Sequence, residues 1–178
     1  MANLELVRSY TIDNTQTSAW NLGTTSEKLF TTAYSKFLIT LKMDGSTTNS
    51  ETIQTRLIDS GGNVISDSEY DNASFQMFAH ATDAQDNGQN ESSIQDIFGT
   101  YDQSPEGLGA SVYIFNPANS SSYTFLQGAS VSAFNGNIKT TKSISVHKVA
   151  EEIIGVQFFV TNTDYFLNAK ASVYGVRS

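Results

Sequence analysis

The chain contains no cysteine, only two prolines and few charged residues. Without cysteine there is neither a disulfide framework nor a thiolate metal site. Charged residues make up 16% of the 178 residues, whereas Ser, Thr, Asn and Gln together number 65. Helical surfaces are usually rich in Glu, Lys and Arg, while sheet surfaces favour Thr and other β-formers. This composition therefore favours an all-β fold.

Long hydrophobic runs are also missing. No stretch approaches the ~18 apolar residues that a membrane helix needs, and the first residues lack the basic segment and apolar core of a secretory signal. We therefore expect no membrane partner. The formal net charge is −8, so phosphate backbones repel the chain and we expect no nucleic-acid partner.

Basic residues are absent from the middle of the chain. Between Arg56 and Lys139 there is no Lys or Arg, and residues 57–138 hold ten Asp and Glu. The middle therefore carries −10 and the remainder +2. One interpretation is an acidic edge or loop face exposed to water. The other is a molecule with two different poles, of which one faces solvent and the other docks on a partner.

Apolar and polar residues alternate along much of the chain, which is typical of half-buried strands. We predict that Ile154, Val156, Phe158 and Val160 form one buried face. Asp59–Asn63 and Asn135–Asn137 supply the positive-φ residues of tight hairpins. Further predicted strands centre on residues 37–43, 53–58, 75–79, 112–115, 123–125, 131–134, 144–146 and 171–173.

The spacing of these strands predicts the architecture. Strand centres about 10–15 residues apart indicate a single antiparallel β-sandwich, jelly-roll-like, over residues 1–178. Residues 1–17 are either the first strand of this sandwich or an assembly arm that adds a strand to a partner. We expect residues 82–107 to form a long polar acidic loop with one short helical turn at Ser93–Ile97.

The sequence shows no catalytic motif. It contains no phosphate-binding loop, no nucleophile elbow and no H-E-x-x-H helix. His80 and His147 have no second ligand at metal-like spacing, and we expect His147 at the surface because it continues the side of Ser143 and Ser145. Glu151-Glu152 do not form a catalytic pair, since neighbours on a strand point to opposite faces. We expect no enzymatic activity and no catalytic, cofactor-binding or metal-binding residues.

Two weaker patterns remain. Asp83–Glu91 gathers oxygen ligands around a glycine as calcium loops do, but the twelfth position is Ile94, where an EF-hand requires a bidentate Glu. We therefore expect a solvated acidic loop without a tight calcium site. Trp20, Tyr101 and Tyr113 are candidate platforms for stacking on sugars, although aromatic residues on strands more often belong to the core.

Several short motifs follow one another between residues 30 and 177. The last is Ser172-Val173-Tyr174-Gly175-Val176-Arg177, in which Gly175 leaves room for a neighbouring chain or a large side chain. The earlier ones are Tyr34–Ile39, Arg56–Gly62, Ser68–Ala73, Val112–Thr124 and Ile153–Asn168. In the same order, they resemble the motifs of a large family of virion structural proteins in marine tailed bacteriophages. That family ends in a [ST]-[LI]-Y-G-I-K strand, and Val-Arg stands here for Ile-Lys.

The resemblance implies an all-β, jelly-roll-like component of the virion that is made in the host cytoplasm and carries no catalytic residues. We expect a capsid decoration or cement protein on the particle surface, in contact with other virion proteins such as the major capsid protein or tail proteins. We also expect a homo-oligomer, with trimers favoured by capsid symmetry. The first alternative is a tail- or fibre-associated module that binds host surface glycans, and the second is a polysaccharide-cleaving domain.

Overall fold

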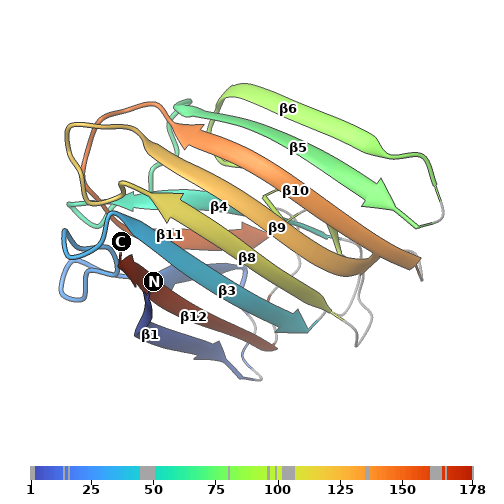
Figure 1. Cartoon of the computed structure of the whole chain (residues 1–178), viewed down its shortest axis with the longest axis horizontal. Helices are drawn as coiled ribbons and strands as arrows, with labels where there is room; N and C mark the ends of the chain where they lie inside the picture. Colours follow the sequence, from blue (N-terminus) through green and yellow to red (C-terminus); the bar gives the residue numbers. More distant parts are fainter. Residues whose placement is uncertain are drawn as a thin grey trace.

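The computed structural model consists of two packed β-sheets and describes residues 3–13, 15, 17–44, 51–79, 81–95, 97, 98, 100, 101, 107–134, 137–160, 166 and 168–177. Eight strands form a large sheet and four form a smaller sheet behind it (Figure 1). The described residues include no helix. The predicted all-β sandwich is therefore confirmed.

Neighbouring strands are antiparallel throughout both sheets. In spatial order the large sheet contains β1 (Asn3–Ile12), β12 (Asn168–Arg177), β3 (Lys36–Asp44), β8 (Leu108–Phe115), β9 (Thr124–Phe134), β10 (Asn137–His147), β5 (Tyr70–Phe78) and β6 (Ala84–Glu91). The small sheet contains β2 (Ala19–Leu22), β11 (Ile153–Val160), β4 (Glu51–Asp59) and β7 (Thr100–Tyr101). Most connections cross from one sheet to the other, as in jelly-roll sandwiches. The exceptions join β5 to β6, β8 to β9 and β9 to β10.

The core lies between the sheets and uses the alternating positions of their strands. Ile154, which the alternation placed on the buried face of β11, is buried but lies outside this core. A bulge between Ile153 and Gly155 shifts the register of β11 against β4, and Ile153 takes the inward position instead. The central core members are Phe37, Ile39, Leu41, Met43, Ile53, Leu57, Val156, Phe158 and Val160.

Most of residues 1–17 belongs to the sandwich. β1 lies at the edge of the large sheet and pairs with β12 along its length, from Asn3 opposite Arg177 to Ile12 opposite Ala169. Of the two alternatives for this segment, the structure therefore shows the first strand of the sandwich. Its first residues remain exposed, with Leu4 and Leu6 both more than half accessible. The chain therefore begins and ends on adjacent strands at one end of the molecule (Figure 1).

The expected long loop over residues 82–107 is wrong in two respects. Ala84–Glu91 forms β6, the exposed edge strand beside β5. The following segment enters the molecule, where Ile94, Ile97 and Phe98 are fully buried. Thr55 and Ile94 exchange two backbone hydrogen bonds of 3.0 and 2.8 Å, which attach this segment to β4. The described part of Ser93–Ile97 contains no helical turn.

The buried segment explains why the inner face of the large sheet is polar at β9 and β10. The inward residues of β9 and β10 are mostly small and polar because the backbone of this segment passes close beneath them. Ser130 Oγ donates to Phe98 O at 2.6 Å, and Ser143 Oγ donates to Ile97 O at 3.1 Å. A Cβ at Gly128 would lie 2.6 Å from Ile97 O. The apolar alternating positions of these strands consequently face outward.

Candidate functional site

The outer face of the large sheet is the first candidate site. The register places its outward residues in four rows across β8, β9, β10 and β5. These rows are Phe115, Phe125, Val146 and Asp71; Tyr113, Gln127, Ile144 and Ala73; Ser111, Ala129, Lys142 and Phe75; and Gly109, Val131, Thr140 and Met77. We call these sixteen positions the outer grid. Ten of them are apolar and only two are charged, so most of this face is suited to contact with another apolar surface.

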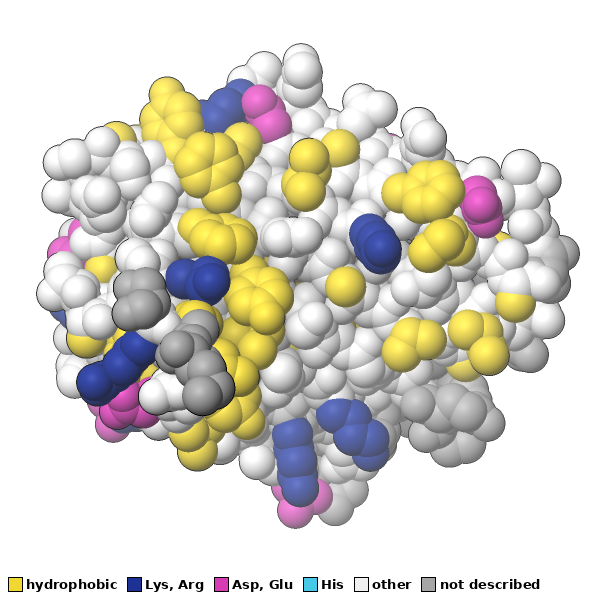
Figure 2. All heavy atoms as spheres, in the orientation of Figure 1, with side chains coloured by type: hydrophobic (Ala, Val, Ile, Leu, Met, Phe, Trp, Pro, Cys, Tyr) yellow, Lys and Arg dark blue, Asp and Glu magenta, His cyan; other side chains and the backbone are white. Residues whose placement is uncertain are grey.

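Charge is confined to two positions of the outer grid. Asp71 forms a 2.7 Å ion pair with Lys148, and the Lys148 hydrogen bond lowers the pKa of this carboxyl. Lys142 is exposed and forms no ion pair with any described residue. Figure 2 shows acidic side chains only at the margins of this face. The grid is therefore close to neutral although the whole chain carries −8.

The outer grid exposes large side chains and is shallowly hollowed. Ile144 is 63% exposed and Val131 53%. Two open hollows of about 510 and 740 Å³ lie side by side, and both are lined by Ala73, Gln127 and Ile144. Two shallow, open hollows suit a broad contact better than an enclosed small molecule.

The aromatic residues named above as candidate sugar platforms lie in different environments. Tyr113 belongs to the outer grid, is 37% exposed and stacks on Phe115 with ring centroids 6.3 Å apart. Trp20 is a core residue at 8% exposure, so it is no platform for a sugar. The side chain of Tyr101 lies outside the described residues.

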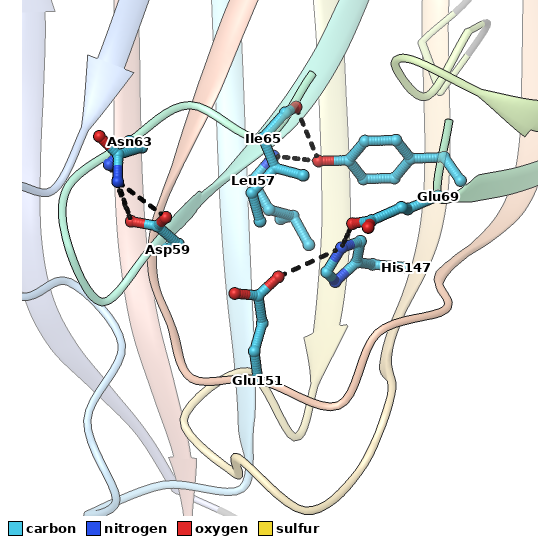
Figure 3. Close-up of polar contacts among 8 residues, drawn as sticks. Leu57, Asp59, Asn63, Ile65, Glu69, His147 and Glu151 are labelled. Carbon is cyan, nitrogen blue, oxygen red and sulfur yellow. Dashed lines mark hydrogen bonds and ion pairs between the residues drawn. The ribbon is translucent and has the colours of Figure 1, made fainter. Parts of the chain in front are cut away.

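The second candidate site is a buried histidine between two carboxylates at one end of the sandwich (Figure 3). His147 ends β10 and its side chain is 0% exposed. Its Nε2 lies 3.0 Å from Glu69 Oε2 and 3.5 Å from Glu151 Oε1. Glu69 immediately precedes β5, and Glu151 lies in the connection from β10 to β11. Both carboxylates are about one-third exposed, so the cluster opens to solvent on their side.

Backbone contacts hold this cluster together. Lys148 N donates to Glu69 O at 2.9 Å, which joins the segment before β5 to the segment after β10. Tyr70, directly opposite His147 in the ladder, packs its ring 5.2 Å from the imidazole. The buried Tyr70 hydroxyl accepts from Leu57 N and donates to Ile65 O. The histidine is therefore fixed by both its own strand and its neighbour.

The cluster is electrostatically negative. Partial burial raises the pKa of the Glu151 carboxyl; His147 opposes this shift, and the nearby Glu69 and Asp59 carboxylates raise the pKa further. Among the described residues, no Lys or Arg forms an ion pair with Glu69 or Glu151. Two carboxylates thus converge on one imidazole nitrogen.

The structure corrects the expectation that His147 lies at the surface. It shares the inward side of β10 with Ser143 and Ser145, and that side faces the interior. Glu151 and Glu152 do point apart, since Glu151 faces His147 while Glu152 pairs with Lys28 at 2.6 Å. His80 lies outside the described residues.

The acidic segment Asp83–Glu91 does not gather its side chains around one point. Its residues from 84 onward form β6, where successive side chains point to opposite faces. Asp83 Oδ1 accepts from Phe78 N at 3.3 Å, and Asp86 Oδ1 accepts from Asn87 N at 2.8 Å. These carboxylate oxygens therefore accept hydrogen bonds from nearby backbone N–H groups.

Comparison of the chain with family models, with curated proteins and with solved structures finds no match. Among the described residues, no helix is long and apolar enough to span a membrane.

Proposed function

We propose that this chain is a structural protein of a bacteriophage virion, a capsid decoration or cement protein that attaches to the particle through the outer grid. The virion role rests on the ordered motif resemblance between residues 30 and 177. The observation that carries the attachment is the neutral, mostly apolar outer grid on a chain of net charge −8. The alternatives, a tail or fibre position included, are separated by the experiments below.

The size of the outer grid suits a protein partner. Four strands about 4.8 Å apart and seven residues of about 3.3 Å each cover roughly 450 Å² of sheet. Stable protein interfaces bury about 800 Å² on each partner, with an apolar centre and a polar rim. The outer grid has the dimensions of such a centre.

The charge of the outer grid restricts its partner. Lys142 projects from the third row and has no described ion-pair partner, so the matching surface should be apolar with a carboxylate opposite this lysine. A second copy docked grid to grid would bury a second Lys142 in the interface, while the one carboxylate of its grid, Asp71, already pairs with Lys148. We therefore place another virion protein, the major capsid protein, on the outer grid, and we assign contacts within the proposed homo-oligomer to other surfaces.

Location and copy number test the virion role. Quantitative mass spectrometry of purified phage particles should find hundreds of copies of the chain, and a reconstruction should place its density on the shell. A few copies to some dozens, on the tail or fibre, would favour the alternative module. Absence of the chain from purified particles would contradict the virion proposal.

Ile144→Asp tests the attachment surface. Ile144 lies in the middle of the outer grid and is 63% exposed. The variant should therefore melt close to the wild type, since exposed substitutions usually change stability by less than about 0.5 kcal/mol. The affinity of the variant for phage particles that lack this protein should fall at least about tenfold, as expected when a charge is buried in an interface centre. Sedimentation with particles measures the bound fraction.

Ala19→Asp is the matched control. Ala19 is exposed but lies on edge strand β2 of the small sheet, on the other side of the sandwich from the outer grid. It should retain binding to particles. Equal loss of binding by both variants, or no loss by Ile144→Asp, would show that attachment uses another surface.

One observation favours glycan binding as the second candidate function. Tyr113, Phe115 and Phe125 are neighbours on the outer grid, and the larger hollow beside them is lined by Asn87 and Gln89. Aromatic faces next to amide groups suit sugar rings. A glycan array would support this function if a defined glycan bound and Phe125→Ala abolished the binding while particle attachment was unaffected.

A further inference from the structure

We propose that Glu69, His147 and Glu151 form a binding site for a divalent transition-metal ion of the Zn²⁺ type, placed at the end of the sandwich where β5 begins and β10 ends. This site is independent of the proposed function and involves none of the outer grid. It differs from the acidic segment Asp83–Glu91 in position and in the kind of ligand it offers.

The geometry of the three groups fits a coordination polyhedron. Ligands about 2.0–2.2 Å from Zn²⁺ lie roughly 3.3 Å from one another in a tetrahedral arrangement. The distances from His147 Nε2 are 3.0 Å to Glu69 Oε2 and 3.5 Å to Glu151 Oε1. All three ligand atoms lie within 4.8 Å of one another. An ion therefore binds between them after small movements of side chains that are already turned toward a common point (Figure 3).

The ligand set indicates the class of metal. One imidazole and two carboxylates suit zinc and similar first-row ions, whereas calcium and magnesium prefer oxygen ligands alone. Three protein ligands leave a position for water, and the exposed side of Glu69 and Glu151 provides access to it. The expected site is therefore open and partly hydrated rather than a closed four-ligand structural site.

The electrostatics favour a cation. Glu69 and Glu151 place two carboxylates against the same nitrogen, where their negative charges repel each other, and no Lys or Arg of the described residues forms an ion pair with either of them. A divalent ion would replace this repulsion with attraction. It would also link three segments that meet here: the residue before β5, the end of β10 and the connection to β11.

The second ring nitrogen of His147, Nδ1, limits the affinity of the site for a metal ion. When Nε2 binds a metal, the proton of the neutral ring resides on Nδ1. That atom is buried and has no hydrogen-bond partner among the described residues. Metal-binding histidines usually donate this proton to a carboxylate or carbonyl. We therefore expect an affinity below that of closed zinc sites, with the metal detectable by direct titration.

Titration of the full chain tests the site. Protein treated with chelator is titrated with ZnCl₂ by isothermal calorimetry, and with CoCl₂ while visible absorption reports the coordination of the ion. We expect one equivalent of Zn²⁺ to bind and to raise the melting temperature. Glu69→Gln and Glu151→Gln should each weaken binding at least about tenfold, because each removes a charged ligand.

Glu152→Gln provides the matched control. Glu152 is the sequence neighbour of Glu151 but pairs with Lys28, so its replacement should leave the affinity for Zn²⁺ unchanged. Melting curves recorded without metal should show that all three variants are folded. Absence of stoichiometric binding by the wild type would overturn the proposal. Undiminished binding by both Glu69→Gln and Glu151→Gln would also overturn it.

Discussion

Two glycines show how strongly single positions constrain this molecule. A Cβ at Gly128 would meet the backbone of Ile97, and a Cβ at Gly175 would lie 2.6 Å from ring atoms of Tyr34. In the first case the glycine lets a buried segment pass beneath the sheet. In the second it lets an aromatic ring lie over the last strand, as expected from the sequence around Gly175. Neither position has space for a larger residue.

Asp59 stabilises the turn between β4 and the segment that returns beside it. Its Oδ1 accepts from Asn63 N at 2.8 Å, and its Oδ2 accepts from Asn63 Nδ2 at 3.0 Å. Burial alone would raise the pKa of this carboxyl, but hydrogen bonds from Asn63, Gly61 and Gly62 outweigh that effect and lower it. Gly62 lies within the turn at φ +85°, a conformation that favours glycine.

We predict that Asp59→Asn lowers the free energy of unfolding by about 1 kcal/mol at pH 7, because hydrogen bonds to a solvent-accessible carboxylate are partly screened. The pKa of Asp59 is lower in the folded state, so its contribution is complete above the unfolded pKa near 4. It is lost as pH falls through the folded pKa. Denaturant titrations at pH 7 and at successively lower pH should show a difference that shrinks as the pH falls below about 4. Asp67→Asn, at an exposed neighbour, is the control and should leave the stability unchanged across this pH range.

At the scale of the strands, β11 is one of the two inner strands of the small sheet. Phe158 is fully buried in the core, and its ring centroid lies 5.4 Å from that of Phe98. Phe159, the next residue, is on the opposite face and contacts Arg56, whose guanidinium carbon lies 4.4 Å from its ring centroid. One strand therefore offers a buried and a partly exposed phenylalanine side by side.

We predict that Phe158→Ala lowers the free energy of unfolding by about 3–5 kcal/mol, the usual cost of removing a buried aromatic ring. Phe159→Ala should cost clearly less because Phe159 is only partly buried. Urea denaturation of both variants measures the difference. Equal losses would contradict the assignment of the two faces of β11.

Alternation predicted the strands better than it predicted their orientation. On β3 the large apolar residues form one face, so the inward side was evident from Phe37 and Ile39. On β10 the same rule gave two faces and implied that the side of Ser143 is exposed, whereas the structure has Ile144 outward and Ser143 inward. The choice depends on the buried segment around Ile97, whose close approach requires small residues above it. This information lies almost fifty residues away in the chain and has no local signal.

The candidate metal cluster was missed for a related reason. Glu69 and His147 are 78 residues apart and meet only because Tyr70 lies opposite His147 in the β5–β10 ladder. Glu151 was assigned to a strand, where it would have pointed away from its neighbours. It lies instead in the connection before β11, four residues after His147. Finding this cluster requires the register of the β5–β10 ladder, which the sequence alone does not supply.

Across the whole molecule, the described acidic residues between 57 and 138 lie outside the outer grid, except Asp71 at its corner. Asp59 and Glu69 lie at one end of the sandwich, and Asp86 lies on edge strand β6. The central strands β8 and β9 contain no charged residue at all. The charge is therefore divided between an acidic end and edge and a neutral broad face, which favours the interpretation of a molecule with two different surfaces.

We predict that deletion of residues 2–12 lowers the melting temperature by several degrees or more. The deletion removes β1, which pairs with β12 alone among the described strands, and with it the contribution of Ile12 to the core. Thermal denaturation followed by circular dichroism measures the change. A truncated protein that melts like the wild type would show that β1 contributes little to the sandwich and is available to a partner.

The position of β12 has a consequence for synthesis of the chain. β12 leaves the ribosome after β1 and β3, yet it lies between them in the large sheet. Until it emerges, the nascent chain carries β1 without its neighbour and β3 with one unpaired edge, both open to pairing with other chains. Such distant pairing also slows folding, typically to milliseconds or seconds. Chains released before β12 is complete should therefore be the main source of aggregated protein during expression.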